Sequence, residues 1–133
     1  MKMNDKYSAT LTGVNQEDIN RFGALHGTTG RTHTDPEYAK LHFGGVIVQG
    51  GLVMAPVLDI FESLLGAHWY EASDMDAKFV AITRPGDIVN VTLEVVERDA
   101  ESIKIAYSCA LQDGKVVQVG EVRHRFKASA NAN

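Results

Sequence analysis

The stretch GGLVMAPVLDIFESLLG, at residues 50–66, decides the fold of this 133-residue chain. Its apolar side chains are distributed almost all round a helix, and a helix of that kind has to be buried on most sides. A glycine pair opens the helix, and Gly66 ends it, as glycine commonly does at a helix C-terminus. Pro56 falls one turn into the helix, where we expect it to bend the helix rather than abolish it. The sequence therefore predicts one central, largely buried helix.

The residues after this helix alternate with a period of two, which is typical of strands. Strands are predicted at residues 75–79, 88–96, 102–111 and 116–126. They are separated by turn sequences, PGD at 85–87, RDA at 98–100 and DGK at 113–115. An earlier alternation at residues 7–14 adds a short edge strand. We therefore expect an α+β fold in which a long antiparallel sheet wraps around the central helix.

Two shorter helices are predicted between the first strand and the central helix. Asn15 has the character of an N-cap, with Asp18 three residues later, which predicts a helix over about residues 16–25. Asp35-Pro36 supplies a second N-cap and a first helical residue. The helix that it begins is expected to end near Leu41.

The segment between these two helices is predicted to be a loop. Residues 26–34 are all Gly or Thr apart from Arg31 and the histidines His26 and His33, a composition that favours neither a helix nor a packed strand. An imidazole titrates near neutral pH and can both accept and donate a proton. His33 stands in this loop and is followed by a glycine-led apolar helix, an arrangement that can place an acid/base group beside an acyl carbonyl.

Composition is typical of one globular domain, residues 1–133, with an Ala/Asn-rich tail at about 128–133 that we expect to be disordered. The formal charge of -4 and the absence of a Lys/Arg block argue against nucleic-acid or membrane-surface partners. Cys109 is the only cysteine, and no apolar signal core follows the first residues. The longest apolar stretch, 52–60, is about half the length that a membrane span needs. These features predict a cytoplasmic protein that acts on a small molecule.

Three segments carry a resemblance to a known family: GTTGRTHTD at 27–35, FGGVIVQGG at 43–51 and RPGD at 84–87. They resemble the MaoC-like branch of the hot-dog fold, the (R)-specific enoyl-CoA hydratases and 3-hydroxyacyl dehydratases, over about residues 15–127. The family patterns are a Gly-Asp-x-Asn-Pro-x-His-x-Asp loop, a Phe-x-x-x-Ile-x-His-Gly helix entry and a Pro-x-x-x-Gly-Asp hairpin. The resemblance implies a hot-dog fold, no cofactor, and a homodimer in which the loop of one chain meets the helix entry of the other.

The match to the first two patterns is incomplete at positions that carry chemistry. His33 and Asp35 match the loop pattern, whereas Thr28 stands where the family has its catalytic aspartate. Gly30-Arg31 replaces Asn-Pro, and Gln49 replaces the histidine of the helix entry. The fold that the resemblance implies is unaffected by these replacements, but the reaction has to proceed without the aspartate.

Four residues are catalytic candidates: the resemblance implies the roles of His33 and Gly50, and side-chain chemistry suggests those of Thr28 and His26. His33 would be the acid/base, and the N–H at Gly50 would hold the thioester oxygen at the positive end of the helix. Thr28 would orient a water or a substrate hydroxyl, and His26 would supply a second titrating group. Structural alternatives stay open: a backbone hydrogen bond for His33, a tight helix entry for Gly50, and a favourable charge at a helix C-terminus for His26.

Four further residues are predicted to bind the substrate. Gln49 and Gly51 lie at the helix entry, where Gln49 would position water or substrate. Arg31 and Arg84 could meet the phosphates of a coenzyme A or phosphopantetheine arm, or be solvated only. No Cys or His pair has zinc-site spacing, so no metal is expected.

The leading interpretation is a lyase of fatty acid metabolism that adds or removes water at the 2,3 bond of an acyl thioester, such as an enoyl-CoA or a 3-hydroxyacyl-CoA. Two alternatives stay open. A hot-dog thioesterase would use an acidic residue on the central helix, for which Asp59 is the candidate. A noncatalytic partner subunit of a heteromeric hydratase would also lack the family aspartate.

Overall fold

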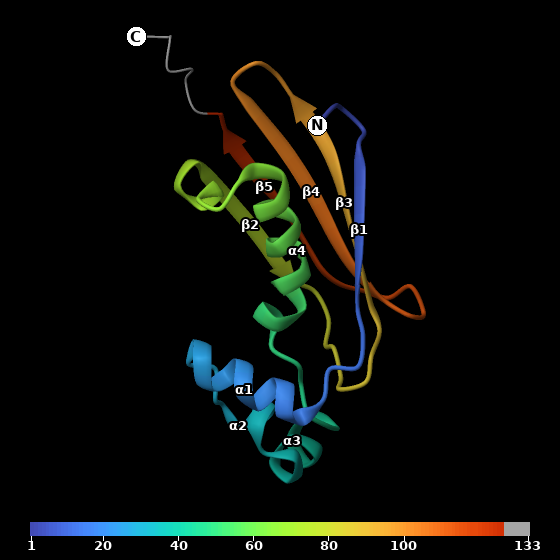
Figure 1. Ribbon diagram of the computed structural model, residues 1–133. Coiled ribbons are helices and arrows are strands. Elements are labelled where there is room, and N and C mark those ends of the chain that lie inside the picture. The colour runs from blue at the N-terminus through green and yellow to red at the C-terminus, as the bar shows by residue number, and fades with distance from the viewer. Residues whose placement is uncertain (127–133) are drawn as a thin grey trace.

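Five antiparallel strands form a single sheet in the computed structural model, which describes residues 1–126 (Figure 1). Their order is β1-β3-β4-β5-β2, so β1 and β2 are the edge strands. The strands are β1 Lys6–Leu11, β2 Ser73–Phe79, β3 Val89–Arg98, β4 Ser102–Leu111 and β5 Val116–Arg125. All five predicted strands are present, with ends that differ from the predicted ends by a few residues at most. The tail predicted at 128–133 lies outside the described residues.

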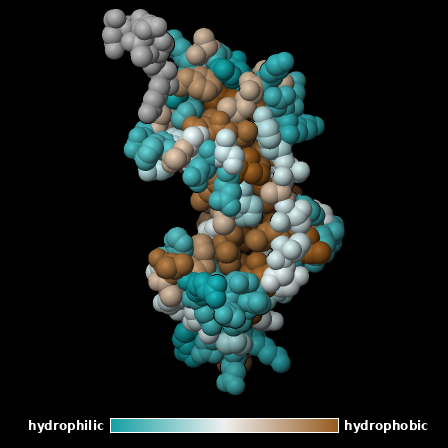
Figure 2. Space-filling view, in the orientation of Figure 1, coloured by the Kyte–Doolittle hydropathy of each residue, from teal (hydrophilic) through white to brown (hydrophobic). Residues whose placement is uncertain are grey.

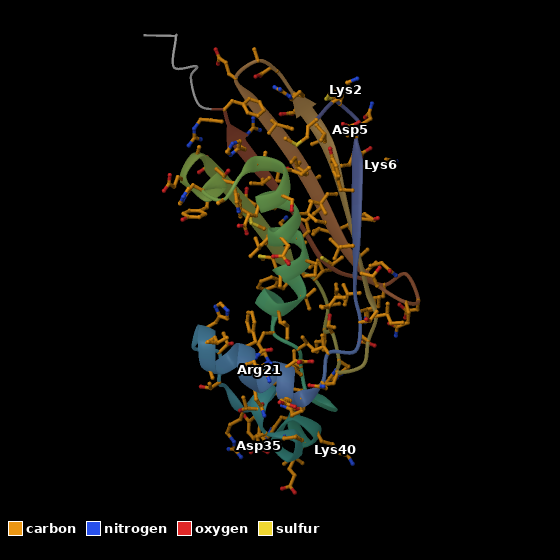
Figure 3. All side chains as sticks on the ribbon, viewed as in Figure 1. Lys2, Asp5, Lys6, Arg21, Asp35 and Lys40 are labelled. Carbon is orange, nitrogen blue, oxygen red and sulfur yellow. The ribbon has the colours of Figure 1, made fainter. Side chains whose placement is uncertain are left out.

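One long helix covers a face of the sheet, and three short helices gather at one end of the molecule (Figure 1). The helices are α1 Gln16–His26, α2 Arg31–Thr34, α3 Pro36–Phe43 and α4 Gly50–Leu65, followed by the single-turn 3-10 helix η1 Trp69–Ala72. Arg21, Asp35 and Lys40 mark the helical end, and Lys2, Asp5 and Lys6 lie at the opposite end (Figure 3). α4 is the predicted central helix, and it contains Pro56.

The core lies between α4 and the inner face of the sheet. Alternate residues of β3 and β4 are buried, as their period-two pattern predicts. On α4 the buried stripe is Val53, Val57 and Phe61, while Asp59 lies on the exposed side. The Phe61 ring packs against Tyr107, with ring centroids 6.4 Å apart. This arrangement confirms the predicted α+β hot-dog fold.

The opposite face of the sheet is polar. Cross-strand ion pairs lie along it, Lys6 with Glu94 and Lys104 with Glu121, at N–O distances of 3.9 and 3.2 Å. Exposed pairs of this kind contribute little to stability, so their main effect is to keep this face in contact with water.

The short helices begin as their sequences predict. Asn15 accepts a hydrogen bond from the Asp18 N–H, and the Asp18 carboxylate accepts one from the Asn15 N–H, which forms a capping box at α1. Asp35 accepts from the Tyr38 N–H and caps α3. α3 continues past the predicted end at Leu41 and stops before Gly44, which has φ 76°.

The prediction of an irregular loop over residues 26–34 is wrong in its second half. Arg31–Thr34 forms the helical turn α2, in which the Gly30 carbonyl accepts hydrogen bonds from the N–H groups of His33 and Thr34. The Thr34 hydroxyl also donates to a backbone carbonyl at Gly30. Local side-chain bonds of this kind can fix a turn whose composition does not favour a helix. His33 therefore lies on a defined turn.

Cys109 faces the core from β4 and is fully buried. Burial raises the pKa of its thiol to about 11, because the thiolate would lose its hydration. Among residues 1–126, no helix has both the length and the apolar character that crossing a membrane requires.

Candidate functional site

His33 is held by one hydrogen bond at its ring and by further bonds of the backbone around it. The ring Nδ1 lies 2.6 Å from the Ile47 carbonyl oxygen, and the Ile47 N–H donates to the Thr32 carbonyl at 3.0 Å. The Gln16 side chain donates to the His33 carbonyl at 2.7 Å. Because a carbonyl can only accept, Nδ1 carries a proton in this bond. In the neutral ring Nε2 then keeps its lone pair and can accept a proton.

His33 and Gly50 line the same cleft, which has a volume of about 470 Å³. The cleft separates the α1–α3 end of the molecule from the part that carries α4 and β2, and apolar surface is visible in the hollow there (Figure 2). The other lining residues are mostly apolar: Ile47, Val48, Val53, Phe79, Val80, Ala81, Ile82, Thr83, Val117 and Gln118. An apolar cleft with a few polar groups is the usual form of a small-molecule site.

The first turn of α4 presents two free N–H groups. The carbonyl of Gln49 accepts from the N–H groups of Leu52 and Val53, at 3.0 and 3.1 Å. Within residues 1–126 the N–H groups of Gly50 and Gly51 donate to no protein atom. Two unpaired donors at the positive end of a 16-residue helix can stabilise a developing negative charge.

Aromatic rings lie against both glycines of the helix entry. A Cβ on Gly51 would come within 3.0 Å of the Phe22 ring, and a Cβ on Gly50 would meet the Phe79 ring at a similarly short distance. Because real Cβ atoms rarely approach other atoms so closely, a methyl at either position would force the ring or the helix entry to move. The steric requirement and an oxyanion role are compatible.

Gln118 is a functional candidate that the sequence reasoning missed. Its side chain is 1% exposed, accepts a hydrogen bond from the Tyr107 hydroxyl at 2.7 Å, and donates from Nε2 to the Gly50 carbonyl at 3.1 Å. Burial raises the pKa of Tyr107 well above its usual range, so the hydroxyl keeps its proton. The signal in the sequence is a polar residue on the inner face of β5, directly across from buried Cys109.

Thr28 and Gln49 do not line the cleft with His33. The Gln49 side chain is buried and donates to the Ile19 carbonyl of α1 at 2.8 Å. A Cβ on Gly23 would lie 2.7 Å from the Thr28 carbonyl oxygen and 3.4 Å from Gln49 Nε2, so both residues approach the same turn of α1. Thr28 Oγ1 and Gln49 Oε1 are buried without a hydrogen-bond partner among residues 1–126. A buried polar atom left unpaired costs about 1–3 kcal/mol, so each of these two atoms favours a polar partner such as a water or a substrate hydroxyl.

The remaining predicted residues also lie outside the wall of the cleft. His26 is exposed at the end of α1, with its ring 4.3 Å from the Phe22 ring. Arg31 is exposed, pairs with Asp35 at 3.1 Å and lies over the Tyr38 ring. The Tyr38 N–H and then Arg31 hold the pKa of Asp35 below its usual value.

Arg84 makes hydrogen bonds to the backbone that the amino-acid sequence did not indicate. Its guanidinium donates to the carbonyls of Phe43 and Gly45, each at 2.6 Å. These bonds fix the bend through Gly44 and Gly45, both of which have positive φ. Arg84 therefore holds the chain that leads into α4.

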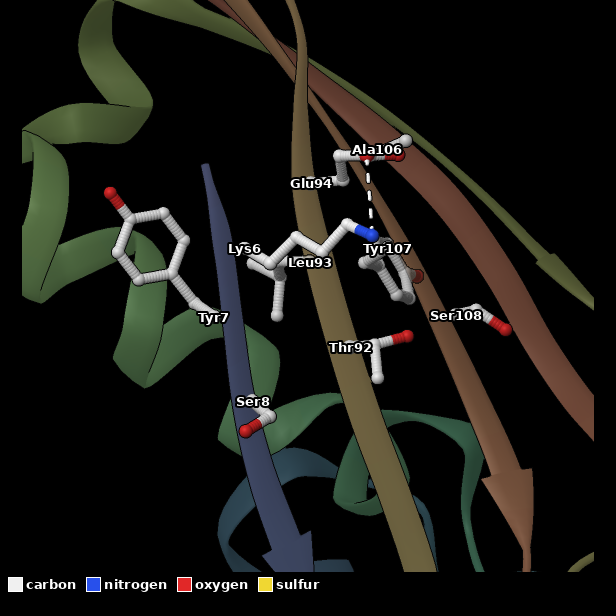
Figure 4. Close-up of a pocket in the computed structure, with 9 residues that line it drawn as sticks. All are labelled: Lys6, Tyr7, Ser8, Thr92, Leu93, Glu94, Ala106, Tyr107 and Ser108. Atoms are coloured by element: carbon white, nitrogen blue, oxygen red, sulfur yellow. Dashed lines mark ion pairs between the residues drawn. The ribbon is translucent and has the colours of Figure 1, made fainter. Parts of the chain in front are cut away.

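Two other hollows lie apart from His33. One lies across β1, β3 and β4 and contains the ion pair of Lys6 and Glu94, but neither an imidazole nor a free helix N-terminus (Figure 4). Asp59 borders a separate groove between α4 and β1, beside Tyr7, and does not meet His33. Within the described part of the chain, no three His, Cys, Asp or Glu side chains lie close enough together to hold a metal ion.

The comparisons with known proteins agree with this architecture. R-Hydratase PhaJ1 from Pseudomonas aeruginosa superposes with a TM-score of 0.79 at 22% identity, covering 97% of this chain and 88% of that one. The (R)-hydratase from A. caviae involved in PHA biosynthesis gives 0.80 at 21% identity, covering 93% and 96%. The MaoC-like dehydratase from Rhodospirillum rubrum gives 0.69 at 20% identity, covering 97% and 96%.

These likenesses establish the fold, and a family model establishes the family. No curated protein is similar enough to this chain to count as a match. The model of the MaoC like domain matches residues 1–120, which is most of the chain. This protein therefore belongs to the MaoC-like domain family.

Proposed function

We propose that this protein is a hydro-lyase that adds water to, or removes it from, the 2,3 bond of an acyl thioester such as an enoyl-CoA or a 3-hydroxyacyl-CoA. The observation that carries the proposal is that His33 and Gly50 line one apolar cleft. His33 contributes a ring fixed through Nδ1, and Gly50 contributes an unpaired N–H at the start of α4. Family membership and the (R)-hydratases of the same fold support the reaction class.

The chemistry in the direction of hydration follows from these two groups. The water oxygen bonds to C3 while His33 Nε2 takes a proton from that water. The electron pair of the 2,3 double bond moves toward the thioester, whose oxygen becomes an enolate facing the N–H groups of Gly50 and Gly51. The imidazolium then returns the proton to C2, and the carbonyl is restored. Dehydration is the reverse, and one base serves both proton transfers.

Thr28 and Gln49 have an indirect part in this proposal. Both oxygens are neutral, so neither takes a proton from water as a carboxylate would. Their oxygens are buried and have no partner among residues 1–126, so we assign them the positioning of a water or a substrate hydroxyl and not proton transfer. His26 is the exposed last residue of α1, where it can exchange protons with solvent.

The phosphates of the carrier are assigned to Arg31 and Arg84. Arg31 is the more available of the two, because its side chain is 67% exposed. Arg84 already donates to three backbone carbonyls, which leaves fewer of its N–H groups for a phosphate. The adenosine phosphates of coenzyme A would therefore meet Arg31 first.

A homodimer is proposed in which the β2 edges face each other. β2 is an edge strand, and Phe79 and Val80 are 65% and 59% exposed at its end. Both residues also form part of the wall of the His33 cleft. An exposed strand edge with apolar residues is a surface that natural proteins normally cover. A second copy would cover it and complete the cleft.

Hydration of enoyl-CoA thioesters of different lengths, followed by loss of the conjugated absorbance, tests the reaction. We expect turnover by the natural protein, and a loss of about 10²- to 10⁴-fold in His33→Ala. His42→Ala is the matched control, because His42 is an exposed histidine of α3 that does not line the cleft. Equal rates in His33→Ala and the natural protein would contradict the proposal.

The same samples distinguish the alternatives. Release of free thiol that depends on Asp59 would indicate a thioesterase. Absence of both activities on every thioester, together with copurification of a second hot-dog chain, would indicate a noncatalytic partner subunit.

A further inference from the structure

The entry of α4 is tied to the sheet by a buried chain of hydrogen bonds. The Tyr107 hydroxyl donates to Gln118 Oε1, and Gln118 Nε2 donates to the Gly50 carbonyl. The direction of each bond is fixed, because the carbonyl can only accept, and the amide that faces it must turn its oxygen toward Tyr107. The chain of bonds therefore has one orientation.

The hydrogen bond to Gly50 sets the direction of the Gly51 N–H. The peptide group between Gly50 and Gly51 is planar and trans, so its N–H points opposite to its carbonyl. A donor that holds the Gly50 carbonyl therefore also aims the Gly51 N–H, which donates to no protein atom within residues 1–126. Donation to the carbonyl also polarises the peptide and strengthens its N–H as a donor.

The burial of Gln118 is difficult to explain as a matter of packing alone. It lies on the inner face of β5, 1% exposed, opposite Cys109 and beside the apolar residues that line the cleft. An apolar side chain of similar size would fill the same space without a polar head to satisfy. The Gly50 carbonyl does not depend on Gln118 for a partner either, because the carbonyl of a first-turn residue accepts the N–H four residues later. What the Gln118 amide adds is a fixed orientation of the peptide group between Gly50 and Gly51.

We propose that Gln118, oriented by Tyr107, is a positioning residue that aims the Gly51 N–H at the thioester oxygen. Gly51 then acts as the second oxyanion donor beside Gly50. The inference rests on the proposed function, since it assumes that an enolate oxygen forms at the entry of α4. It assigns Gln118 no contact with the reacting atoms.

Gln118→Glu separates positioning from packing. A protonated glutamic acid can reproduce both bonds, with its O–H donating to Gly50 and its carbonyl oxygen accepting from Tyr107. An ionised carboxylate cannot donate and repels the Gly50 carbonyl. Burial raises the pKa of a carboxyl, which brings its ionisation toward the working range of the assay. We expect the ratio of kcat in Gln118→Glu to kcat in the natural protein to fall about tenfold as pH rises.

Three comparisons complete the test. Gln118→Met should lower kcat by about tenfold at all pH values while KM stays nearly constant, because the amide is lost but its volume is kept. Tyr107→Phe should also lower kcat, because the hydroxyl that orients the Gln118 amide is lost. Val116→Glu is the control for an added carboxylate, since Val116 is exposed on the same strand and does not line the cleft. A flat kcat ratio in Gln118→Glu, or unchanged kcat in Gln118→Met, would overturn the inference.

A readout that needs no turnover keeps the inference separate from the proposed function. The amide ¹⁵N shift of Gly51 responds to hydrogen bonding at the Gly50 carbonyl, because both belong to one peptide group. Gln118→Met should shift this resonance, and Val116→Glu should not. If the natural protein hydrates no thioester, the proposed function fails. The Gly51 resonance still decides whether Gln118 sets the orientation of the peptide group between Gly50 and Gly51.

Discussion

The ring of Phe79 occupies the space that a side chain on Gly50 would need. A Cβ on Gly50 would come within 2.9 Å of Phe79 Cζ and within 3.0 Å of two other ring carbons. The contact joins the entry of α4 to the end of β2, and both residues line the cleft with His33. The edge strand thus limits the residue that can stand at position 50.

Gly50→Ala should therefore destabilise the protein by about 1–3 kcal/mol, because the added methyl forces the ring or the helix entry to move. Replacing the ring as well, in Gly50→Ala with Phe79→Ala, should recover part of that loss. Denaturant unfolding of both single variants and the double variant gives the coupling free energy. Gly30→Ala is the control, since a Cβ there meets no atom within 4 Å. Strict additivity of the two single variants would refute this contact.

Stability should decrease as pH falls below the ordinary histidine pKa of 6.5, because of His124. Burial lowers the pKa of His124, whose Nδ1 donates to Ser73 Oγ at 2.7 Å while Ser73 donates to the Trp69 carbonyl. The unfolded chain then binds a proton near pH 6.5 that the folded chain binds only at lower pH, so acid favours unfolding. Above pH 6.5 the ring is neutral in both states, and this contribution does not change.

Urea unfolding measured between pH 8 and pH 5 checks this expectation. His124→Asn should show a smaller decrease in the free energy of unfolding over that range than the natural protein. His42→Ala, in which an exposed histidine is removed, should keep the full decrease. Identical slopes for the natural protein and His124→Asn would show that another group is responsible.

Arg84→Ala should lower stability by about 1–2 kcal/mol, because the carbonyls of Phe43 and Gly45 lose charged donors. Thermal unfolding of Arg84→Ala, with Arg123→Ala as the control variant, measures the effect. The control residue pairs with Glu97 on the surface, so its loss should change stability by less than about 1 kcal/mol.

The proposed phosphate contact of Arg84 can be read from KM. If Arg84 also meets a phosphate, Arg84→Ala should raise KM for an enoyl-CoA more than for the matching N-acetylcysteamine thioester, which has no phosphate. Equal changes for both substrates would limit Arg84 to its structural role.

Val80→Glu should weaken association of the chain, since it places a charge on the proposed dimer surface at the end of β2. Sedimentation velocity is expected to give a dimer for the natural protein and a monomer for this variant. Val116→Glu is the control, because Val116 is exposed at the start of β5 and does not line the cleft. A monomeric natural protein would remove the dimer from the proposal.

Periodicity predicted the large elements well, since each has a long repeat and clear end signals. β4 was predicted with its observed bounds, and α4 was predicted from its glycine pair to Gly66. α2 was missed because its stability comes from bonds to the Gly30 carbonyl and not from the propensity of its residues. A composition of glycine and threonine cannot reveal such bonds.

The site was predictable only in part. The family resemblance pointed to His33 and Gly50 and implied that they meet between two chains, whereas the structure places both residues of one chain in one cleft. The resemblance could not show that the Gln49 side chain turns toward α1, or that Gln118 reaches Gly50 across 68 positions of sequence. Both contacts depend on how α1 and β5 pack against the entry of α4, which is a matter of three-dimensional arrangement.

Cys109 has a practical consequence. It is the only cysteine in the chain, lies fully buried, and has a pKa of about 11, so it is almost entirely a thiol at neutral pH and reacts slowly with electrophiles. The natural sequence can therefore be used as its own unreactive background for site-specific labelling. A single Lys40→Cys substitution on the exposed side of α3, away from the β2 edge, would accept a maleimide fluorophore or a spin label there alone. Distances between two such labels would then report the geometry of any assembly directly.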